Sequence, residues 1–296
     1  MLLLIDADII VFRAGFAAEK NVWFLSTNGE EPEQFAYKKE AEARLDEKLP
    51  GKYSREEGKD FQLWSERYLE PVENALHNAK SIVERCRDSL EASDFDVRLY
   101  LSSGSTFRHR IAKTRPYKGN RDTSHRPTHE GAIREYLART WDTTVAADEE
   151  ADDLLGIAQS AAPDDTIICT VDKDLNMIPG WKYDFVKEEK FWVDPDEALH
   201  NFYYQLIVGD STDNIVGIPR AGAARANKIL SDRSLDEQWN SVVAEYMSKG
   251  GENWEDYLRE QGQLLWIRRK EGEMWEPDLE GFGGTEEIQE VSMYGD

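Results

Sequence analysis

Short apolar runs that end in pairs of aspartates constrain this sequence more than any other feature. The N-terminal run LLLIDADII contains Asp6 and Asp8, and the run 166–171 leads into Asp172 and Asp174. Runs of this length are typical of buried strands. In a parallel sheet the functional site lies beyond the carboxyl ends of the strands. The sequence therefore predicts that these carboxylates converge at one edge of a sheet.

Strand-like and helical segments alternate along most of the chain. FDVRLYLSSG predicts a second strand and TTVAA a third, whereas PVENALHNAKSIVERCRDSL repeats its apolar residues at the helical period. Further helices are expected in HEGAIREYLARTW, EEADDLLGIAQSAA and DPDEALHNFYYQLIVG, and around 235–248 and 254–269. This alternation is typical of α/β domains with a mainly parallel sheet. The strongly charged region from about 33 to 90 is expected to be largely helical.

The charge balance limits how this chain can meet a polyanion. Its 296 residues include 36 Lys and Arg against 59 Asp and Glu, giving a formal net charge of −23. Such a surface excludes non-specific nucleic-acid binding by the whole molecule. A polyanion would have to meet a local basic patch or a bound cation.

The cysteines and the hydropathy pattern indicate a cytoplasmic protein without a membrane span. Cys86 and Cys169 are far apart and lie in helical or apolar contexts, as reduced core thiols do. The N-terminal apolar run is too short for a signal peptide or a span, and Asp6 interrupts it.

Four acidic clusters are the candidate chemical site. Besides the two aspartate pairs, they comprise Glu150, Asp152 and Asp153 at a helix start, and Asp210 and Asp213 before a glycine-rich turn. Singly, such acids are more often dipole partners at helix starts or turn residues. Together they fit hard divalent ions such as Mg²⁺, which prefer oxygen ligands. Two such ions can clamp the attacking and leaving oxygens of a phosphoryl displacement.

One conspicuously basic segment, 107–127, complements the acids. Its cations are Arg108, Arg110, Lys113, Arg115, Lys118, Arg121 and Arg126, with Phe107 and Tyr117 interleaved. Positive groups neutralise phosphates, and aromatic faces stack on bases. The alternative is a solvated basic loop that pairs with the acidic surface.

In this order, the motifs resemble those of a known family, the 5′→3′ exonucleases of the flap endonuclease superfamily. The similarity rests on five motifs: LLIDADIIVFR, RPYKGNRD, EEADDLLG, VDKDLNMI and GDSTDNIVGI. In addition, YLREQGQLLWIRR is similar to a late helix in the phage members of the family. The resemblance implies a Rossmann-like, PIN-like nuclease domain over 1–205, with a helical insertion near 33–90 and a basic arch near 107–127. A helix-three-turn-helix DNA-binding region and C-terminal helices would follow over 206–296.

The resemblance also implies roles for individual residues. Lys118, Arg121, Asp6, Asp153 and Asp172 take the catalytic positions, with Lys118 and Arg121 stabilising charge on the phosphate. Asp6, Glu150, Asp152 and Asp153 would hold a first Mg²⁺, and Asp172, Asp174, Asp210 and Asp213 a second, with Mn²⁺ as a substitute. The expected DNA contacts are Arg13, Tyr117, Lys118, Arg121, Gly217, Arg220 and Gly222, with Tyr117 stacking on the end nucleotide.

The implied activity is metal-dependent 5′→3′ exonuclease or 5′-flap endonuclease action that leaves 5′-phosphate products. DNA with 5′ ends or flaps would be the substrate, with RNA primers in RNA–DNA hybrids as a further one. A monomer acting in replication or DNA degradation, with replication proteins as partners, is expected in a bacterial cell or in the host of a phage.

Departures from the family pattern keep an alternative open. Ser103 stands where the family has an aspartate, and the hairpin 220–224 lacks one glycine and the lysine of the usual Gly-Ile-Gly-x-Lys. The alternative is a chain that binds branched or primer-bearing DNA without cutting it. An RNA-directed PIN nuclease is disfavoured because PIN domains generally lack the hairpin.

Overall fold

A six-stranded sheet forms the centre of the computed structural model, which describes residues 1–51, 56–90, 94–121 and 126–280. Its strands run in the order β6-β5-β1-β7-β8-β9. The strands are β1 (Leu2–Asp6), β5 (Asp96–Leu101), β6 (Asp142–Val145), β7 (Thr166–Cys169), β8 (Gly180–Asp184) and β9 (Glu189–Val193). All neighbours pair in parallel except β8 and β9, which are antiparallel. This confirms the predicted α/β fold with a mainly parallel sheet.

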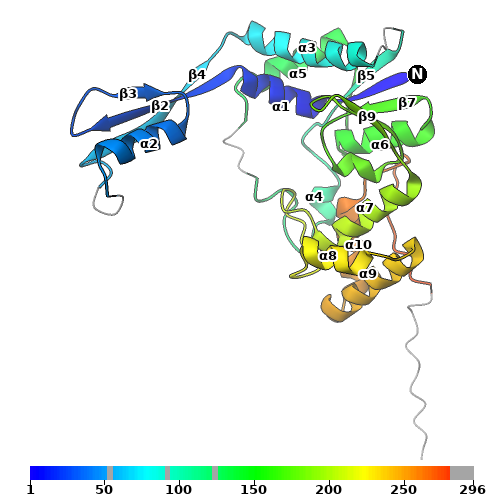
Figure 1. Cartoon of the computed structure of the whole chain (residues 1–296). Coiled ribbons are helices and arrows are strands. Elements are labelled where there is room, and N and C mark those ends of the chain that lie inside the picture. The colour runs from blue at the N-terminus through cyan, green and yellow to red at the C-terminus, as the bar shows by residue number, and fades with distance from the viewer. Residues whose placement is uncertain (52–55, 91–93, 122–125, 281–296) are drawn as a thin grey trace, which may run out of the picture.

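Alternate side chains of β1 enter two different cores. Leu3 and Ile5 pack with three helices on one face of the sheet, whereas Leu4 belongs to the core on the other face. The three helices are α1 (Ala7–Ala17), α3 (Val72–Ser89) and α5 (Glu130–Thr140). The apolar residues of α3 recur at the helical period and are buried where they meet α1 and α5. Figure 1 shows these helices side by side along one side of the molecule.

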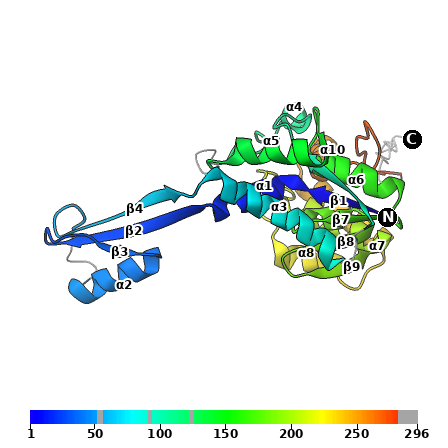
Figure 2. The same ribbon diagram turned by 90° about the horizontal axis from the view of Figure 1, so that it is seen from above.

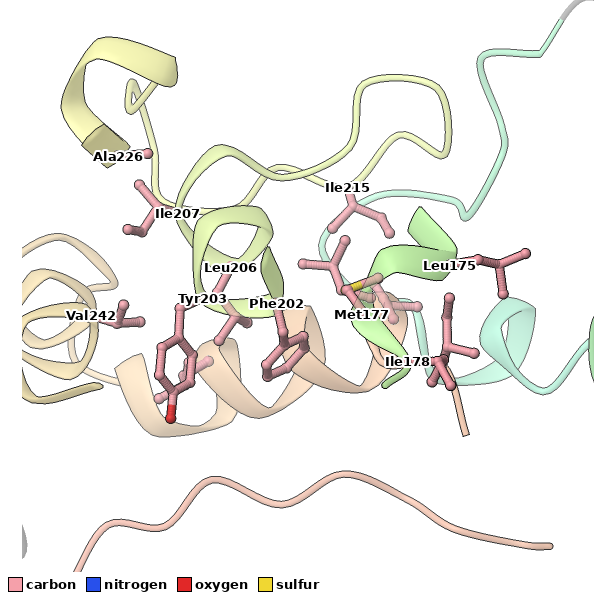
Figure 3. Close-up of a cluster of buried hydrophobic side chains, with 14 of the residues drawn as sticks. Leu175, Met177, Ile178, Phe202, Tyr203, Leu206, Ile207, Ile215, Ala226 and Val242 are labelled. Carbon is pink, nitrogen blue, oxygen red and sulfur yellow. The ribbon is translucent and has the colours of Figure 1, made fainter. Parts of the chain in front are cut away.

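The opposite core joins the sheet to the C-terminal helices. Its elements are α6 (Ala151–Ala161), η1 (Asp174–Met177), α7 (Pro195–Val208), α8 (Ala223–Leu230), α9 (Leu235–Lys249) and α10 (Trp254–Leu265). Figure 3 shows Leu175 and Met177 of η1 gathered with Phe202 and Leu206 of α7 and with Ile215. This packing fixes η1 and the loop after α7, which carry three of the predicted acids, Asp174, Asp210 and Asp213.

An arm projects from the body between α1 and α3 (Figures 1 and 2). It consists of β2 (Glu19–Thr27), β3 (Glu33–Phe35), α2 (Lys38–Lys48) and β4 (Phe61–Leu69), with the strands in the antiparallel order β3-β2-β4. The predicted helical insertion is therefore only partly right: α2 and α3 are helical, but strands β3 and β4 also lie within 33–90. At the base of the arm, Glu70 N donates to Ala18 O across 2.9 Å.

The basic segment contains the short helix α4 (Arg108–Ile111), and residues 112–121 after it form no helix or strand. Residues 122–125 of the predicted arch and 281–296 of the predicted C-terminal region lie outside the described residues. In the described part of the chain, no helix has both the length and the apolar character that a membrane span requires. Cys86 and Cys169 are buried free thiols.

Candidate metal-dependent active site

Asp6 ends the central strand and begins the first helix. Its Oδ1 accepts from Ile9 N at 3.4 Å as the N-cap of α1, and its Oδ2 accepts from Thr170 Oγ1 at 2.8 Å. The side chain is only 2% exposed. Asp8 does not share an extended backbone with Asp6, because α1 already begins at Ala7. The two-residue spacing therefore does not place the two carboxylates on one side of an extended strand.

Asp172 and Asp174 follow β7, the neighbour of β1. Asp172 Oδ1 accepts from Asp174 N at 2.9 Å, and Asp174 opens η1. Gln205 of α7 donates to Asp174 Oδ1. The parallel pairing of β1 with β7 thus brings the two strand-end clusters together, as the sequence predicted.

The third acidic cluster begins α6, where its members face in different directions. Glu150 and Asp153 form a capping box, in which Glu150 N donates to Asp153 Oδ2 across 3.1 Å. Asp152 lines the cleft with Asp6 and Asp172. Asp153 is fully buried, and both its oxygens accept from Arg108, at 2.6 and 2.8 Å. In this structure the Asp153 carboxylate is therefore committed to an internal ion pair.

The fourth cluster lies on the loop after α7. Asp210 and Ile215 exchange two backbone hydrogen bonds, of 2.9 and 2.7 Å, which close the loop on itself. Glycine is required at both ends of the turn: a Cβ on Gly209 would lie 2.3 Å from Ile215 O, and one on Gly217 would lie 2.3 Å from Gly209 N. Both glycines also have positive φ.

The basic segment docks onto this loop. Lys118 N donates to Asp213 O at 2.9 Å, Asn120 Nδ2 to Ser211 O at 2.7 Å, and Asn214 Nδ2 to Pro116 O at 2.9 Å. These bonds place Lys118 Nζ against Glu150 and 3.6 Å from Asp213 Oδ2. Arg121 pairs with Asp213 on the same side.

The carboxylates and these two cations line two adjoining hollows, of about 350 and 460 Å³. The first is bordered by Asp6, Asp8, Arg13, Ser102, Lys118, Arg121, Glu150, Asp152 and Asp172, among others. The second is bordered by Lys118, Arg121, Asp152, Asp172, Asp174, Asp210 and Asp213, among others. We call these hollows together the carboxylate cleft.

Burial and mutual repulsion disfavour the charged form of three carboxylates in the cleft. Burial, with the nearby charges of Asp8 and Asp172, raises the pKa of Asp6 to about 7. Burial and the charges of Asp172 and Asp210 raise the pKa of Asp174 to about 7 as well. Burial and the charges of Asp6 and Asp172 raise the pKa of Asp152 well above its usual value. Carboxylates that resist ionisation in this way gain most from a nearby positive charge.

The chemistry of the donor set fits hard divalent ions, although the ligands are not assembled around one point. All the donors are oxygens, as Mg²⁺ and Mn²⁺ prefer. Within the described residues, however, no three His, Cys, Asp or Glu side chains are grouped closely enough to hold an ion. Glu150 and Asp213 are instead engaged by Lys118, Arg121 and Tyr117. Binding of an ion would therefore require these partners to release the carboxylates.

Several other predicted residues have contacts that the sequence did not reveal. Tyr117 is 5% exposed, and its hydroxyl lies within hydrogen-bond distance, 2.7 Å, of a carboxylate oxygen of both Glu150 and Asp213, so its ring offers no free face to a base. Gly217 N donates to Gln261 Oε1 at 3.0 Å and is not free to meet a phosphate. Arg220 is exposed with φ +62°, and Gly222 caps α8 with open space beside it.

The end of β5 differs from the predicted family pattern in structure as well as in sequence. Ser103 is exposed, and its hydroxyl donates to Ser105 O at 3.4 Å. Asp8 accepts from Arg134 Nη1 at 2.8 Å and from Ser102 N at 2.9 Å. A guanidinium–carboxylate pair thus lies beside this corner of the cleft.

Three residues that support the cleft were missed by sequence reasoning. Arg108 was grouped with the phosphate-binding cations but is 3% exposed and pairs with Asp153. Arg134 pairs with Asp8. Glu260 of α10 accepts from Lys113 N, Thr114 N and Thr114 Oγ1, which fastens the basic segment to the body. For Glu260, the sequence offered only the helical spacing of α10, which predicts a helix there. For the contacts of Arg108 and Arg134, the sequence contained no signal.

Solved structures of phage T5 proteins are similar to this chain. The crystal structure of the T5 D15 protein co-crystallized with metal ions matches with a TM-score of 0.53 and 14% identity, covering 89% of this chain and 88% of that one. This chain has the fold of the T5 D15 protein. At this identity the likeness shows the fold alone.

A second T5 structure is also similar, and the sequence comparisons add nothing further. The T5 5′-exonuclease with bound zinc ions gives a TM-score of 0.48 and 17% identity, covering 89% of this chain and 86% of that one. No protein-family model and no curated protein sequence matches the chain.

Proposed function

We propose that this chain is a divalent-metal-dependent nuclease that hydrolyses DNA phosphodiesters from 5′ ends or at 5′ flaps. The observation that carries the proposal is the carboxylate cleft, in which acids from β1, β7, α6 and the loop after α7 meet beside Lys118 and Arg121. The shared fold with the T5 D15 protein supports it.

The residues of the cleft would have different roles in the reaction. Asp6, Glu150, Asp152, Asp172, Asp174, Asp210 and Asp213 would hold two divalent ions, Mg²⁺ or Mn²⁺. Such ions supply positive charge against the scissile phosphate and lower the pKa of the attacking water. Asp153 would act indirectly, because its pair with Arg108 fixes the start of α6 and hence Glu150 and Asp152.

Lys118 and Arg121 would change their ionic partners from protein carboxylates to a substrate phosphate. In this structure they neutralise Glu150 and Asp213. When ions bind those carboxylates, the two cations would be free to contact the phosphate, where they stabilise the charge that develops during hydrolysis. The products would carry 5′-phosphate ends.

The substrate preference and setting follow from the same proposal. DNA with 5′ ends or flaps is the principal substrate, and RNA–DNA hybrids are a further one. A role in replication or DNA degradation, with replication proteins as partners, fits an enzyme that removes 5′ ends. We propose that it acts as a monomer, because the cleft is built from one chain.

A second candidate function is DNA binding without cleavage. The observation that favours it is the corner at β5, where Ser103 is exposed and Asp8 is held by Arg134. One ligand that the family pattern supplies is therefore missing from that corner.

Cleavage of a 5′-end-labelled duplex and of a 5′-flap duplex, each with Mg²⁺ and with EDTA, separates the two functions. The nuclease is expected to cut only with Mg²⁺, and Asp172→Asn is expected to abolish cutting while DNA binding persists. The charge-matched control is Asp196→Asn, which changes an exposed residue of α7. Retained DNA binding without cutting in Mg²⁺ or Mn²⁺ would reject the nuclease in favour of the second candidate.

A further inference from the structure

A groove of about 660 Å³ lies between α1 and α3, outside the carboxylate cleft. The two helices pack against each other, as Figure 2 shows, and both contribute residues to the lining of the groove. Its polar and aromatic lining consists of Phe12, Arg13, Phe16, Asn78, Ser81 and Arg85. Among the residues that the structure describes, no acidic one lines the groove, although the chain carries 59 Asp and Glu. A surface with this lining in so acidic a protein is suited to an anionic ligand.

The two arginines of the groove are exposed and unpaired. Neither Arg13 nor Arg85 makes a side-chain hydrogen bond or ion pair with another residue that the structure describes. Most cations of the basic segment differ in this respect: Arg108, Arg110 and Arg121, for example, each pair with an acid. Guanidinium groups left free in this way bind phosphate groups well, because their donors match the phosphate oxygens.

Two phenylalanines add an aromatic surface beside the arginines. The ring centroids of Phe12 and Phe16 are 6.1 Å apart, with the planes tilted by 44°. Phe16 is 42% exposed, so its ring is accessible to a ligand in the groove. Nucleobases stack on exposed aromatic rings whatever their sequence.

The groove is continuous with the carboxylate cleft. Phe12 and Arg13 line both hollows. At its other end the groove reaches Phe16 and Ala17, next to the strand that starts the arm. A chain of nucleotides that leaves the cleft along α1 would therefore meet free cations and aromatic faces in succession.

We propose that the groove binds a single-stranded segment of the DNA substrate, holding its phosphates on Arg13 and Arg85 and its bases on Phe12 and Phe16. This inference rests on the proposed function, because it takes the cleft as the place where DNA is cut. Binding would be independent of sequence, since no base-edge hydrogen bond is involved.

The test is fluorescence anisotropy in EDTA, with a labelled oligothymidylate, a 5′-flap duplex and a blunt duplex as probes. The variants are Arg85→Ala and Phe16→Ala, both at exposed positions where folding is not at stake. Lys80→Ala is the matched control, because it removes one positive charge from the same helix, where Lys80 pairs with Glu84 instead.

Arg85→Ala is expected to reduce the slope of log affinity against log salt concentration by about 0.7, the value for one phosphate contact on a single strand. Phe16→Ala is expected to weaken oligothymidylate binding about 5-fold to 100-fold, the loss of one stacked base. Both effects should appear with the single strand and the flap duplex but not with the blunt duplex, and Lys80→Ala should show neither.

Equal effects of Arg85→Ala and Lys80→Ala would overturn the inference, since they would show only a general response to charge. Binding of polyglutamate as tight as that of oligothymidylate, and unaffected by Phe16→Ala, would also overturn it in favour of an acidic protein partner. Cleavage of the flap duplex with Mg²⁺ tests the proposed function separately. If the wild type cuts but Arg85→Ala and Phe16→Ala bind single strands as the wild type does, the groove proposal is rejected and the nuclease proposal stands.

Discussion

Arg108 donates hydrogen bonds to both carboxylate oxygens of Asp153, at 2.6 and 2.8 Å, in the interior beneath the carboxylate cleft. Burial by itself would raise the pKa of Asp153, but the hydrogen bonds and charge of Arg108 outweigh it and hold that pKa below its usual value. Two further bonds from Arg108, to Leu264 O and Trp266 O, tie the pair to the end of α10. The pair thus joins the basic segment, α6 and α10.

Loss of Arg108 is expected to destabilise the fold strongly. Arg108→Ala leaves Asp153 buried and unpaired, which should lower the free energy of unfolding by about 3–5 kcal/mol. Urea unfolding followed by circular dichroism measures this change. Arg110→Ala is the control, because its pair with Asp148 is exposed and solvent-screened and should contribute little to stability. Similar small losses in both variants would contradict the interpretation.

Lys182 is expected to make stability depend on pH. Its ammonium is buried on β8 without a hydrogen-bond partner among the described residues, and burial with the nearby charge of Arg269 lowers its pKa to about 7. For a base with a lowered folded pKa, stability is full above the unfolded pKa of 10.5 and is lost as pH falls towards 7.

Lys182→Met should therefore raise the free energy of unfolding at pH 6 by a few kcal/mol, since one pKa unit is worth about 1.4 kcal/mol. The gain should shrink as the pH rises towards 10. Lys187→Met, at an exposed lysine of the neighbouring turn, should show no such trend. A gain that does not vary with pH would point to packing instead of charge.

Divalent ions are expected to stabilise the folded chain. Because the folded pKa of Asp6 is raised from 3.8 to about 7, its contribution to stability is full below pH 3.8 and is lost as pH rises through about 7. In EDTA at pH 8, Asp6→Asn should therefore raise the melting temperature.

The same variant should lose most of the stabilisation by Mg²⁺, which at 100 times the dissociation constant amounts to about 2.7 kcal/mol for one site. Differential scanning fluorimetry with and without Mg²⁺ measures both effects, with Asp196→Asn as the charge-matched control. An equal Mg²⁺ shift in wild type and Asp6→Asn would argue against Asp6 as a ligand.

Lys118 is expected to act on the rate of cleavage more than on the affinity for DNA. Lys118→Ala removes a donor to the developing charge and should lower kcat about 10²-fold to 10³-fold. Lys113→Ala removes a cation of the same segment whose side chain has no partner among the described residues, and it should leave kcat nearly unchanged. Single-turnover cleavage in Mg²⁺ gives these rates; equal losses in both variants would reduce Lys118 to a general electrostatic role.

The sequence predicted the sheet and the convergence of the acids because both follow from local patterns. Apolar strand runs ending in aspartates specify the carboxyl edge of a parallel sheet, and the fold confirms that edge. The arm was not predictable in the same way. In β4 no residue is buried, so the alternation that marks a strand is absent, and its partner β2 lies far away in the sequence.

The partners of charged side chains could not be predicted either. Arg108 and Arg121 looked alike as members of a basic segment, yet one is buried with Asp153 and the other is half exposed beside Asp213. Each partner lies more than 40 residues away, so only the folded chain decides which cation is internal.

The arm leaves the body and returns to it through adjacent residues, since Ala18 and Glu70 share a backbone hydrogen bond. An insertion whose ends lie side by side can be shortened, exchanged or removed without moving the strands and helices that carry the cleft. The arm is therefore a detachable module in the evolutionary sense. Related chains could differ in length, charge and partner at this position while keeping the same chemistry.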